Sequence, residues 1–129
     1  MNKHTPCNLD TDTTTHPSRL KTMVRTQPCP FWQQHTVAVP PCCPITGNPQ
    51  SGTVSVRYRP AGSSLEVFAL EQYVKSFVGG HESGERNQEG MIQLIAQDCA
   101  AAAGVSVRVV ADLVLRGGQR LLIVARAKA

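Results

Sequence analysis

Two adjacent cysteines lie between prolines in the stretch PPCCPITGNPQ, residues 40–50. A thiol in this setting can be a small buried side chain, a metal ligand or a nucleophile. Cys43 precedes a proline, and the Thr-Gly-Asn-Pro sequence that follows is typical of a turn. A rigid, partly exposed loop suits a nucleophilic thiol, because a neighbouring polar group or backbone dipole can favour the thiolate. In the absence of such a loop, a small buried side chain would be the favoured interpretation.

The number and spacing of the cysteines bear on what the thiols do. The five are Cys7, Cys29, Cys42, Cys43 and Cys99. An odd number does not fit a complete disulfide framework, and no two cysteines have the C-x-x-C spacing of a structural zinc site. No apolar stretch approaches the roughly 20 residues that span a bilayer, and the first 20 residues lack the apolar core of a secretion signal. We therefore expect free thiols in a cytoplasmic protein without a membrane segment.

Glu89 is the second residue whose type and place could carry chemistry. It follows Gln88 at the start of a predicted helix, where a carboxylate is favoured by the helix dipole and is ordinarily a surface residue. The functional interpretation is a carboxylate that accepts two N–H bonds from a purine-like ring. The amide of Gln88 could add hydrogen bonds to the same ring.

Other polar features of the sequence give weaker indications of function. His81, Glu82 and Glu85 follow a Gly-Gly pair, but they lack an obvious fourth ligand for zinc, so a solvated loop is the favoured interpretation. The chain has no G-x-G-x-x-G fingerprint and no Walker lysine. Its net charge of +4 is compatible with a nucleotide or RNA partner without indicating one.

Hydrophobic periodicity predicts four strands and two helices. Residues 34–39, 53–59, 105–115 and 120–127 have the character of strands, and residues 63–77 and 88–103 have that of helices. Ser64 is expected to cap the first helix, with Val67, Leu70, Val74 and Phe77 on its apolar face. The Gly117-Gly118 pair predicts a hairpin between the last two strands.

This order predicts an α+β fold in which four antiparallel strands carry both helices on one face, as ββααββ. Residues 34–129 are expected to form the single domain, and residues 1–33, which are rich in Thr, Pro, Asn and Asp, a flexible N-terminal arm. The uncovered sheet face and the long edge strands predict a homo-oligomer.

Several stretches resemble the 7-cyano-7-deazaguanine (nitrile) reductases. The segment CPITGNPQ, 43–50, is similar to their Cys-Pro-x-Thr-Gly-Gln-Pro-Asp motif, and further similarity lies in VSVRYRP, LEVFALEQYVKSF and QEGMIQLIAQD. The last of these also resembles a helix of GTP cyclohydrolase I. Both families have the tunnelling fold (T-fold), a ββααββ unit that assembles into oligomeric barrels. The resemblance covers residues 34–126 and implies this fold, with active sites between subunits.

By position, the resemblance implies that Cys43 adds to the nitrile of the substrate and forms a covalent thioimide. Glu89 would bind the amino group and ring N–H edge of the deazaguanine, beside Gln88. Glu66 aligns with the first residue of a lysine-containing motif that lies at the substrate and cofactor interface of the reductases.

Departures from the family pattern affect the second step. The general acid of the reductases, an Asp seven residues after the cysteine, is Gln50 here, and an amide cannot donate a catalytic proton in that way. The motif lysines are replaced by Phe68 and Glu71, so the cations suited to the phosphates of NADPH are missing. These departures favour ammonia as the second nucleophile, as in the similar archaeosine-forming amidinotransferases, although water remains an alternative.

The leading hypothesis is therefore an enzyme that captures the nitrile of 7-cyano-7-deazaguanine, free or within a modified nucleic acid, through Cys43. It favours no cofactor. One alternative is an NADPH-dependent reductase with a rearranged cofactor site. The other is a non-catalytic T-fold module that uses Glu89 to bind a purine or pterin.

Overall fold

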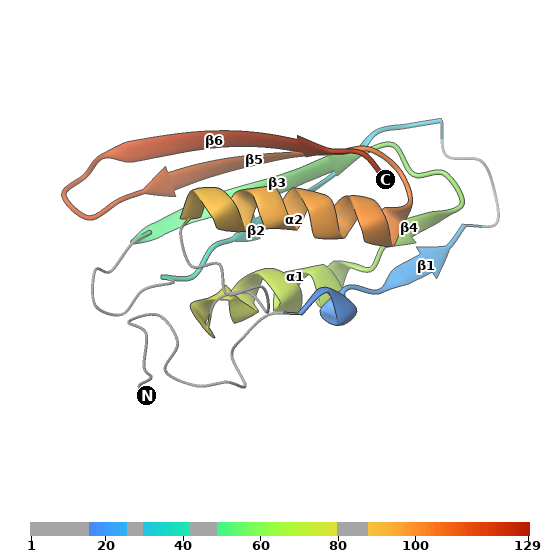
Figure 1. Cartoon of the computed structure of the whole chain (residues 1–129), viewed down its shortest axis with the longest axis horizontal. Helices are drawn as coiled ribbons and strands as arrows, with labels where there is room; N and C mark the ends of the chain where they lie inside the picture. The colour runs from blue at the N-terminus through green and yellow to red at the C-terminus, as the bar shows by residue number, and fades with distance from the viewer. Residues whose placement is uncertain (1–15, 26–29, 42–48, 80–87) are drawn as a thin grey trace.

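Strands whose residues alternate between buried and exposed form the main sheet of the protein (Figure 1). A computed structural model describes residues 16–25, 30–41, 49–79 and 88–129. The sheet contains, in spatial order, β2 (Gln33–Ala38), β3 (Ser51–Tyr58), β5 (Val107–Val114) and β6 (Arg120–Ala127). All neighbouring strands are antiparallel. The predicted α+β class and the four predicted strands are confirmed.

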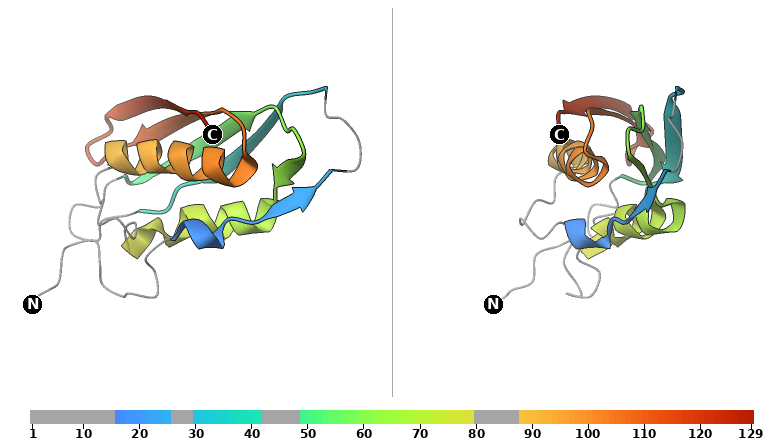
Figure 2. Two further views of the ribbon diagram at one scale, coloured as in Figure 1. Left: turned by 45° about the vertical axis from the view of Figure 1, so that its right-hand side comes forward. Right: turned by 90° about the vertical axis from the view of Figure 1, so that its right-hand side faces the viewer.

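Two helices, α1 (Val67–Lys75) and α2 (Gln88–Ala103), lie on the same side of the main sheet (Figures 1 and 2). The side chains that face them from the strands are apolar and buried, among them Val54, Val56 and Val109. Helix α2 contributes Ile92, Ile95 and Cys99 to the same core, and α1 contributes Leu70, Tyr73 and Val74. Alternation in the strands and helical spacing in the helices thus direct one apolar face of each element into a single core.

The two helices are also joined by a polar contact. The hydroxyl of Tyr73 in α1 donates a hydrogen bond of 2.6 Å to Asp98 Oδ2 in α2. The neighbouring Cys99 is a free thiol whose pKa is raised to about 12 by burial and by the charge of Asp98. A thiol with so high a pKa stays protonated and is a packing residue, not a nucleophile.

The prediction that Ser64 caps the first helix is wrong. Residues Ser63–Leu65 form a short strand, β4, which pairs antiparallel with β1 (Thr22–Val24). Helix α1 therefore begins later, at Val67, and Glu66 is its N-cap. Val67 stands in the first helical position and is 58% exposed, so its predicted place on the buried face is wrong as well.

Strand β1 and a 3-10 turn at Pro17–Arg19 belong to the segment expected to be a flexible arm. The backbone N–H of Glu66 donates to the carbonyl of Lys21, which ties this segment to the start of α1. The predicted ββααββ order lacks two strands, because β1 and β4 form a second, two-stranded sheet in addition to the main sheet. The division at residue 33 stays a prediction.

Tyr58, on β3, has a buried hydroxyl that joins three strands. It donates to Gln33 Oε1 on β2 at 2.8 Å and accepts from the backbone N–H of Leu65 on β4 at 2.8 Å. The Nε2 atom of His35 lies 3.2 Å away, and its ring stacks on that of Tyr58. A hydroxyl has one proton and two acceptor positions, so this arrangement satisfies it when His35 donates from Nε2.

Replacing Tyr58 with Phe is expected to lower the free energy of unfolding by about 2 kcal/mol, because Leu65 N–H and Gln33 lose a buried partner. Urea denaturation measures this change. Thr36→Val is the matched control and should cost less, since the hydrogen bond of Thr36 to Ser55 is exposed. Equal losses in the two variants would contradict the role given to the Tyr58 hydroxyl.

The stability of the protein should also depend on pH through His35. Burial lowers the pKa of His35 below its ordinary value of 6.5. The unfolded chain then binds a proton at His35 more readily than the folded chain, so stability falls as the pH drops below about 6.5. As the pH is lowered from 8 to 5, the urea midpoint should fall more steeply for the wild type than for His35→Gln. Identical slopes would show that His35 does not contribute.

Candidate functional site

Gln50 is fixed at the beginning of β3, while the segment that carries Cys43 lies outside the described residues. The backbone N–H of Gln50 donates to the carbonyl of Val114 at 2.8 Å, which continues the pairing of β3 with β5. The side chain of Gln50 is exposed. The sheet therefore holds the backbone of Gln50 and leaves its amide open to solvent.

Gln88 and Glu89 are the first two residues of α2. Glu89 is exposed and Gln88 is half-buried. The beginning of α2 lies at the same end of the main sheet as the beginning of β3 and the hairpin between β5 and β6 (Figure 1). One end of the sheet thus carries Gln50, Gln88 and Glu89, from two elements far apart in the sequence.

Glu66 lies at the other end of the molecule. Its carboxylate accepts hydrogen bonds of 3.0 Å each from the backbone N–H groups of Phe68 and Ala69 and so caps α1. The beginning of α1 lies beside β1 and β4, away from the beginning of α2 (Figure 1). A single chain does not bring Glu66 together with Glu89, and the substrate-binding role of Glu66 stays a prediction.

The exposed side of α1 lacks cations available to a phosphate. Phe68 is 73% exposed, and Glu71 forms an ion pair of 3.0 Å with Lys75 one turn later. Lys75 is the sole cation of α1, and this carboxylate engages it. The lack of a cofactor expected from the two missing lysines stays a prediction.

A hollow of about 360 Å³ lies between α1 and the edge strand β2. Its lining includes His35 and Val37 from β2 and Leu70 and Glu71 from α1. Among the described residues, β2 pairs only with β3, so its other edge presents backbone donors and acceptors. The sequence named Glu71 but did not predict the hollow, because the hollow depends on how α1 lies against β2.

No group of three His, Cys, Asp or Glu side chains is placed to hold a metal ion within the described parts of the chain. The His81, Glu82 and Glu85 cluster lies outside them, so its interpretation as a solvated loop stays a prediction. In the described part, no helix is long and apolar enough to cross a membrane.

The sequence of this chain is similar to those of known proteins over part of its length. No family model matches the chain. Over 77 residues the chain is 39% identical to the NADPH-dependent 7-cyano-7-deazaguanine reductase of Frankia casuarinae, a match that covers 59% of this chain and 58% of the relative. It is 34% identical over 89 residues to the enzyme of the same name from Anaeromyxobacter sp., which covers 65% and 66% of the two chains. The resemblance to the 7-cyano-7-deazaguanine reductases is confirmed.

The match covers only part of each relative, so it does not by itself establish their activity for this chain. The chain spans 58% to 66% of the length of these two relatives. A third, from another Anaeromyxobacter strain, is 31% identical over 84 residues. The names of the reductases state a dependence on NADPH, whereas the departures of this chain from the family pattern favour no cofactor. The nucleophile that attacks the thioimide is therefore inferred from the residues of this chain.

Proposed function

We propose that this protein converts the nitrile of 7-cyano-7-deazaguanine through a covalent bond to Cys43. The similarity to 7-cyano-7-deazaguanine reductases is the observation that carries the proposal. In the first step the Cys43 sulfur attacks the nitrile carbon, a C–S bond forms, and the nitrile nitrogen takes a proton. This addition gives a thioimide and requires no oxidant or reductant.

Glu89 has the role of holding the ring during this step. A carboxylate at the exposed beginning of α2 can accept hydrogen bonds from both the exocyclic amino group and a ring N–H of the deazaguanine. Gln88 and Gln50 lie at the same end of the sheet and supply neutral amide groups there. Neither amide can act as the general acid, so they orient the substrate and the proton comes from elsewhere.

Ammonia is the proposed second nucleophile. It attacks the thioimide carbon, the C–S bond breaks, and the product leaves as an amidine while the thiol regains its proton. Gln50 in the place of the acid and the lack of available cations on α1 support this non-reductive step. Phe68 and Glu71 do not fit the phosphates of NADPH, so the leading proposal contains no step through that cofactor.

The fold proposed for the active protein is a T-fold assembled as an oligomeric barrel with active sites between subunits. In the described part of the chain the main sheet has open edges at β2 and β6, and Leu122 and Val124 on β6 are 65% and 49% exposed. Edges of this kind invite pairing with other copies. A site between chains would also allow Glu66 of one copy to approach Glu89 of another, which a single chain does not allow.

Product identification by mass spectrometry tests this function. Incubation of the protein with 7-cyano-7-deazaguanine and ammonium should give a product heavier than the nitrile by the mass of ammonia. Cys43→Ala should give none. A product heavier by four hydrogens that forms only with NADPH would replace the proposal with reduction, and a product heavier by water would replace ammonia with water.

The reductase is the second candidate, and the names of the relatives favour it. It predicts a loss of NADPH absorbance that depends on the nitrile. A flat trace at high enzyme concentration would remove this candidate. Binding of the nitrile without turnover, unchanged by Cys43→Ala, would instead support a non-catalytic binding module.

A further inference from the structure

Three arginines form a row across the face of the main sheet that carries no helix. Arg57 on β3 is paired in register with Arg108 on β5, and Arg108 is paired with Arg126 on β6. Their neighbours Tyr58, Val107 and Ala125 are buried, so the arginines point to the opposite face, where all three are exposed. Adjacent strands lie about 4.8 Å apart, so the row is roughly 10 Å long.

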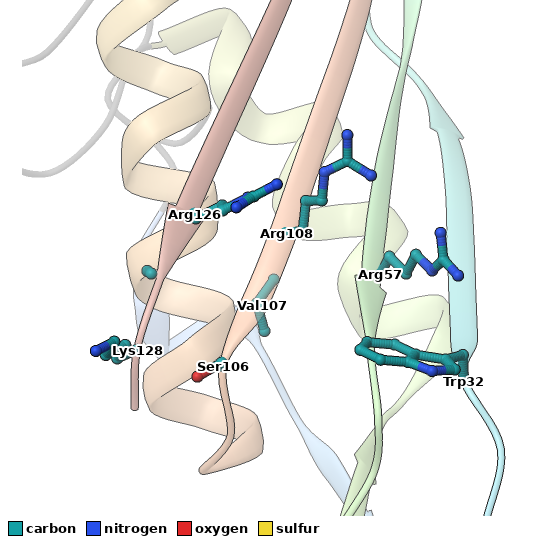
Figure 3. A pocket seen from close by; sticks show the side chains of 8 residues that line it. Trp32, Arg57, Ser106, Val107, Arg108, Arg126 and Lys128 are labelled. Carbon is teal, nitrogen blue, oxygen red and sulfur yellow. The ribbon is translucent and has the colours of Figure 1, made fainter.

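An aromatic ring stands at one end of this row. The guanidinium of Arg57 lies 5.1 Å from the centre of the Trp32 ring, and Trp32 is 60% exposed. Figure 3 shows Trp32, Arg57, Arg108 and Arg126 around the same pocket, which also reaches Lys128. The pocket has a volume of about 480 Å³. We call Trp32, Arg57, Arg108 and Arg126 the arginine row pocket.

The charges of this pocket are not balanced within the described residues. No carboxylate there forms an ion pair with Arg57, Arg108 or Arg126. On the same face Asp112 pairs with Arg120 at 2.5 Å, and Asp112 is four residues along β5 from Arg108. Like charges directly opposite each other on neighbouring strands are destabilising. The row therefore costs the fold stability, and an anionic ligand would offset that cost.

From this arrangement we propose that the arginine row pocket binds single-stranded nucleic acid. Guanidinium groups suit phosphate oxygens, and a row about 10 Å long is longer than one phosphate group and can contact successive phosphodiesters. The exposed face of Trp32 offers a stacking surface for a base. A cationic groove combined with an exposed aromatic ring is the arrangement by which proteins hold single strands.

The pocket lies at the opposite end of the main sheet from Gln50, Gln88 and Glu89, which are assigned to the nitrile chemistry. It lies where β3 and β6 end and β5 begins, whereas α2 and Glu89 begin at the other end of the sheet (Figure 1). The proposal therefore goes beyond the nitrile chemistry and does not need it. Cys43→Ala should bind nucleic acid like the wild type, so the two proposals can fail independently.

Trp32 gives a direct readout because it is the one tryptophan of the chain. Titration with an unlabelled ten-nucleotide single-stranded RNA of mixed sequence should quench its fluorescence. The slope of log K against log salt concentration should be about −2, from three phosphate contacts at roughly −0.7 each. A double-stranded RNA of the same sequence should quench less, because its bases are not free to stack.

The double variant Arg108→Gln/Arg126→Gln should bind at least tenfold more weakly and lose about 1.4 from the salt slope. Lys75→Gln/Arg116→Gln is the matched control, since it removes the same charge from α1 and from the β5–β6 hairpin. It should keep the quenching and the affinity. The arginine variant should unfold at a urea concentration no lower than the wild type, because it removes repulsion.

Three results would overturn the proposal. The first is no quenching by RNA at low salt. The second is an equal loss of affinity in the arginine variant and its charge-matched control, which would mean binding to net charge alone. The third is stronger quenching by NADP⁺ or AMP than by the oligonucleotide, which would make this a small-nucleotide site.

Discussion

Replacing Gly52 with alanine is expected to lower the free energy of unfolding by about 2–4 kcal/mol. Gly52 has a φ of +150°, which side chains rarely adopt, and it lies on β3 opposite Leu113 of β5. A Cβ atom at this position would meet the backbone carbonyl of Asp112 and would lie 2.9 Å from Leu113 Cα. These contacts involve backbone, so the two strands would have to separate there. Gly52 follows Gln50 by two residues, and the same change should loosen the end of the sheet that carries the site.

Urea denaturation of Gly52→Ala against Gly62→Ala measures this effect. Gly62 is the matched control because a Cβ built there has no heavy atom within 4 Å. Gly62→Ala should change the urea midpoint little. Equal midpoints for the two variants would contradict the close approach of β3 and β5 at Gly52.

The second large effect is expected at Glu89. Glu89→Gln should weaken the binding of 7-cyano-7-deazaguanine by about 100-fold, because the new amide group places a donor opposite a donor of the ring. Hydrogen bonds to a charged group contribute about 1.5–3 kcal/mol, and each 1.4 kcal/mol is a factor of ten. Calorimetric titration of the Cys43→Ala protein separates this binding from the covalent step.

Gln97→Ala serves as the control for the Glu89 measurement. Gln97 is also exposed on α2 but lies two turns further along the helix. Its replacement should leave the affinity unchanged. If Glu89→Gln binds the nitrile as tightly as the wild type, the ring is held by other residues.

The main sheet and both helices could be predicted because each has many residues with one clear period. Helix α2 begins and ends where the sequence analysis placed it, from Gln88 to Ala103, with its last residue next to Gly104. Strand β6 likewise has its predicted bounds. Long periodic segments determine their own conformation well, since many residues support the same pattern.

The errors concern short segments that depend on distant contacts. Strands β1 and β4 have three residues each and exist because they pair with one another across about 40 residues of sequence. Pairing of β4 removed Ser64 from the helix, and the carboxylate of Glu66 then took the capping position. A capping pattern in the sequence does not reveal that a strand competes for the same residues.

The candidate site could be predicted residue by residue but not in its arrangement. The resemblance to the reductases named Glu66 and Glu89 together, whereas the fold places them at different ends of one chain. The arginine row pocket was missed because each strand contributes a single arginine. Only the register of β3, β5 and β6 places the three in line, although the alternation around Arg57, Arg108 and Arg126 could have indicated their shared face.

The central claim is that Cys43 captures the nitrile covalently. The intact mass of the wild-type protein, measured after incubation with 7-cyano-7-deazaguanine alone, tests it most directly. The mass should rise by the full mass of the nitrile compound, since the thiol adds without a leaving group. Cys42→Ala should form the same adduct, and Cys43→Ala should form none. No adduct on the wild type at any pH from 5 to 9, or an adduct that persists in Cys43→Ala, would contradict the account.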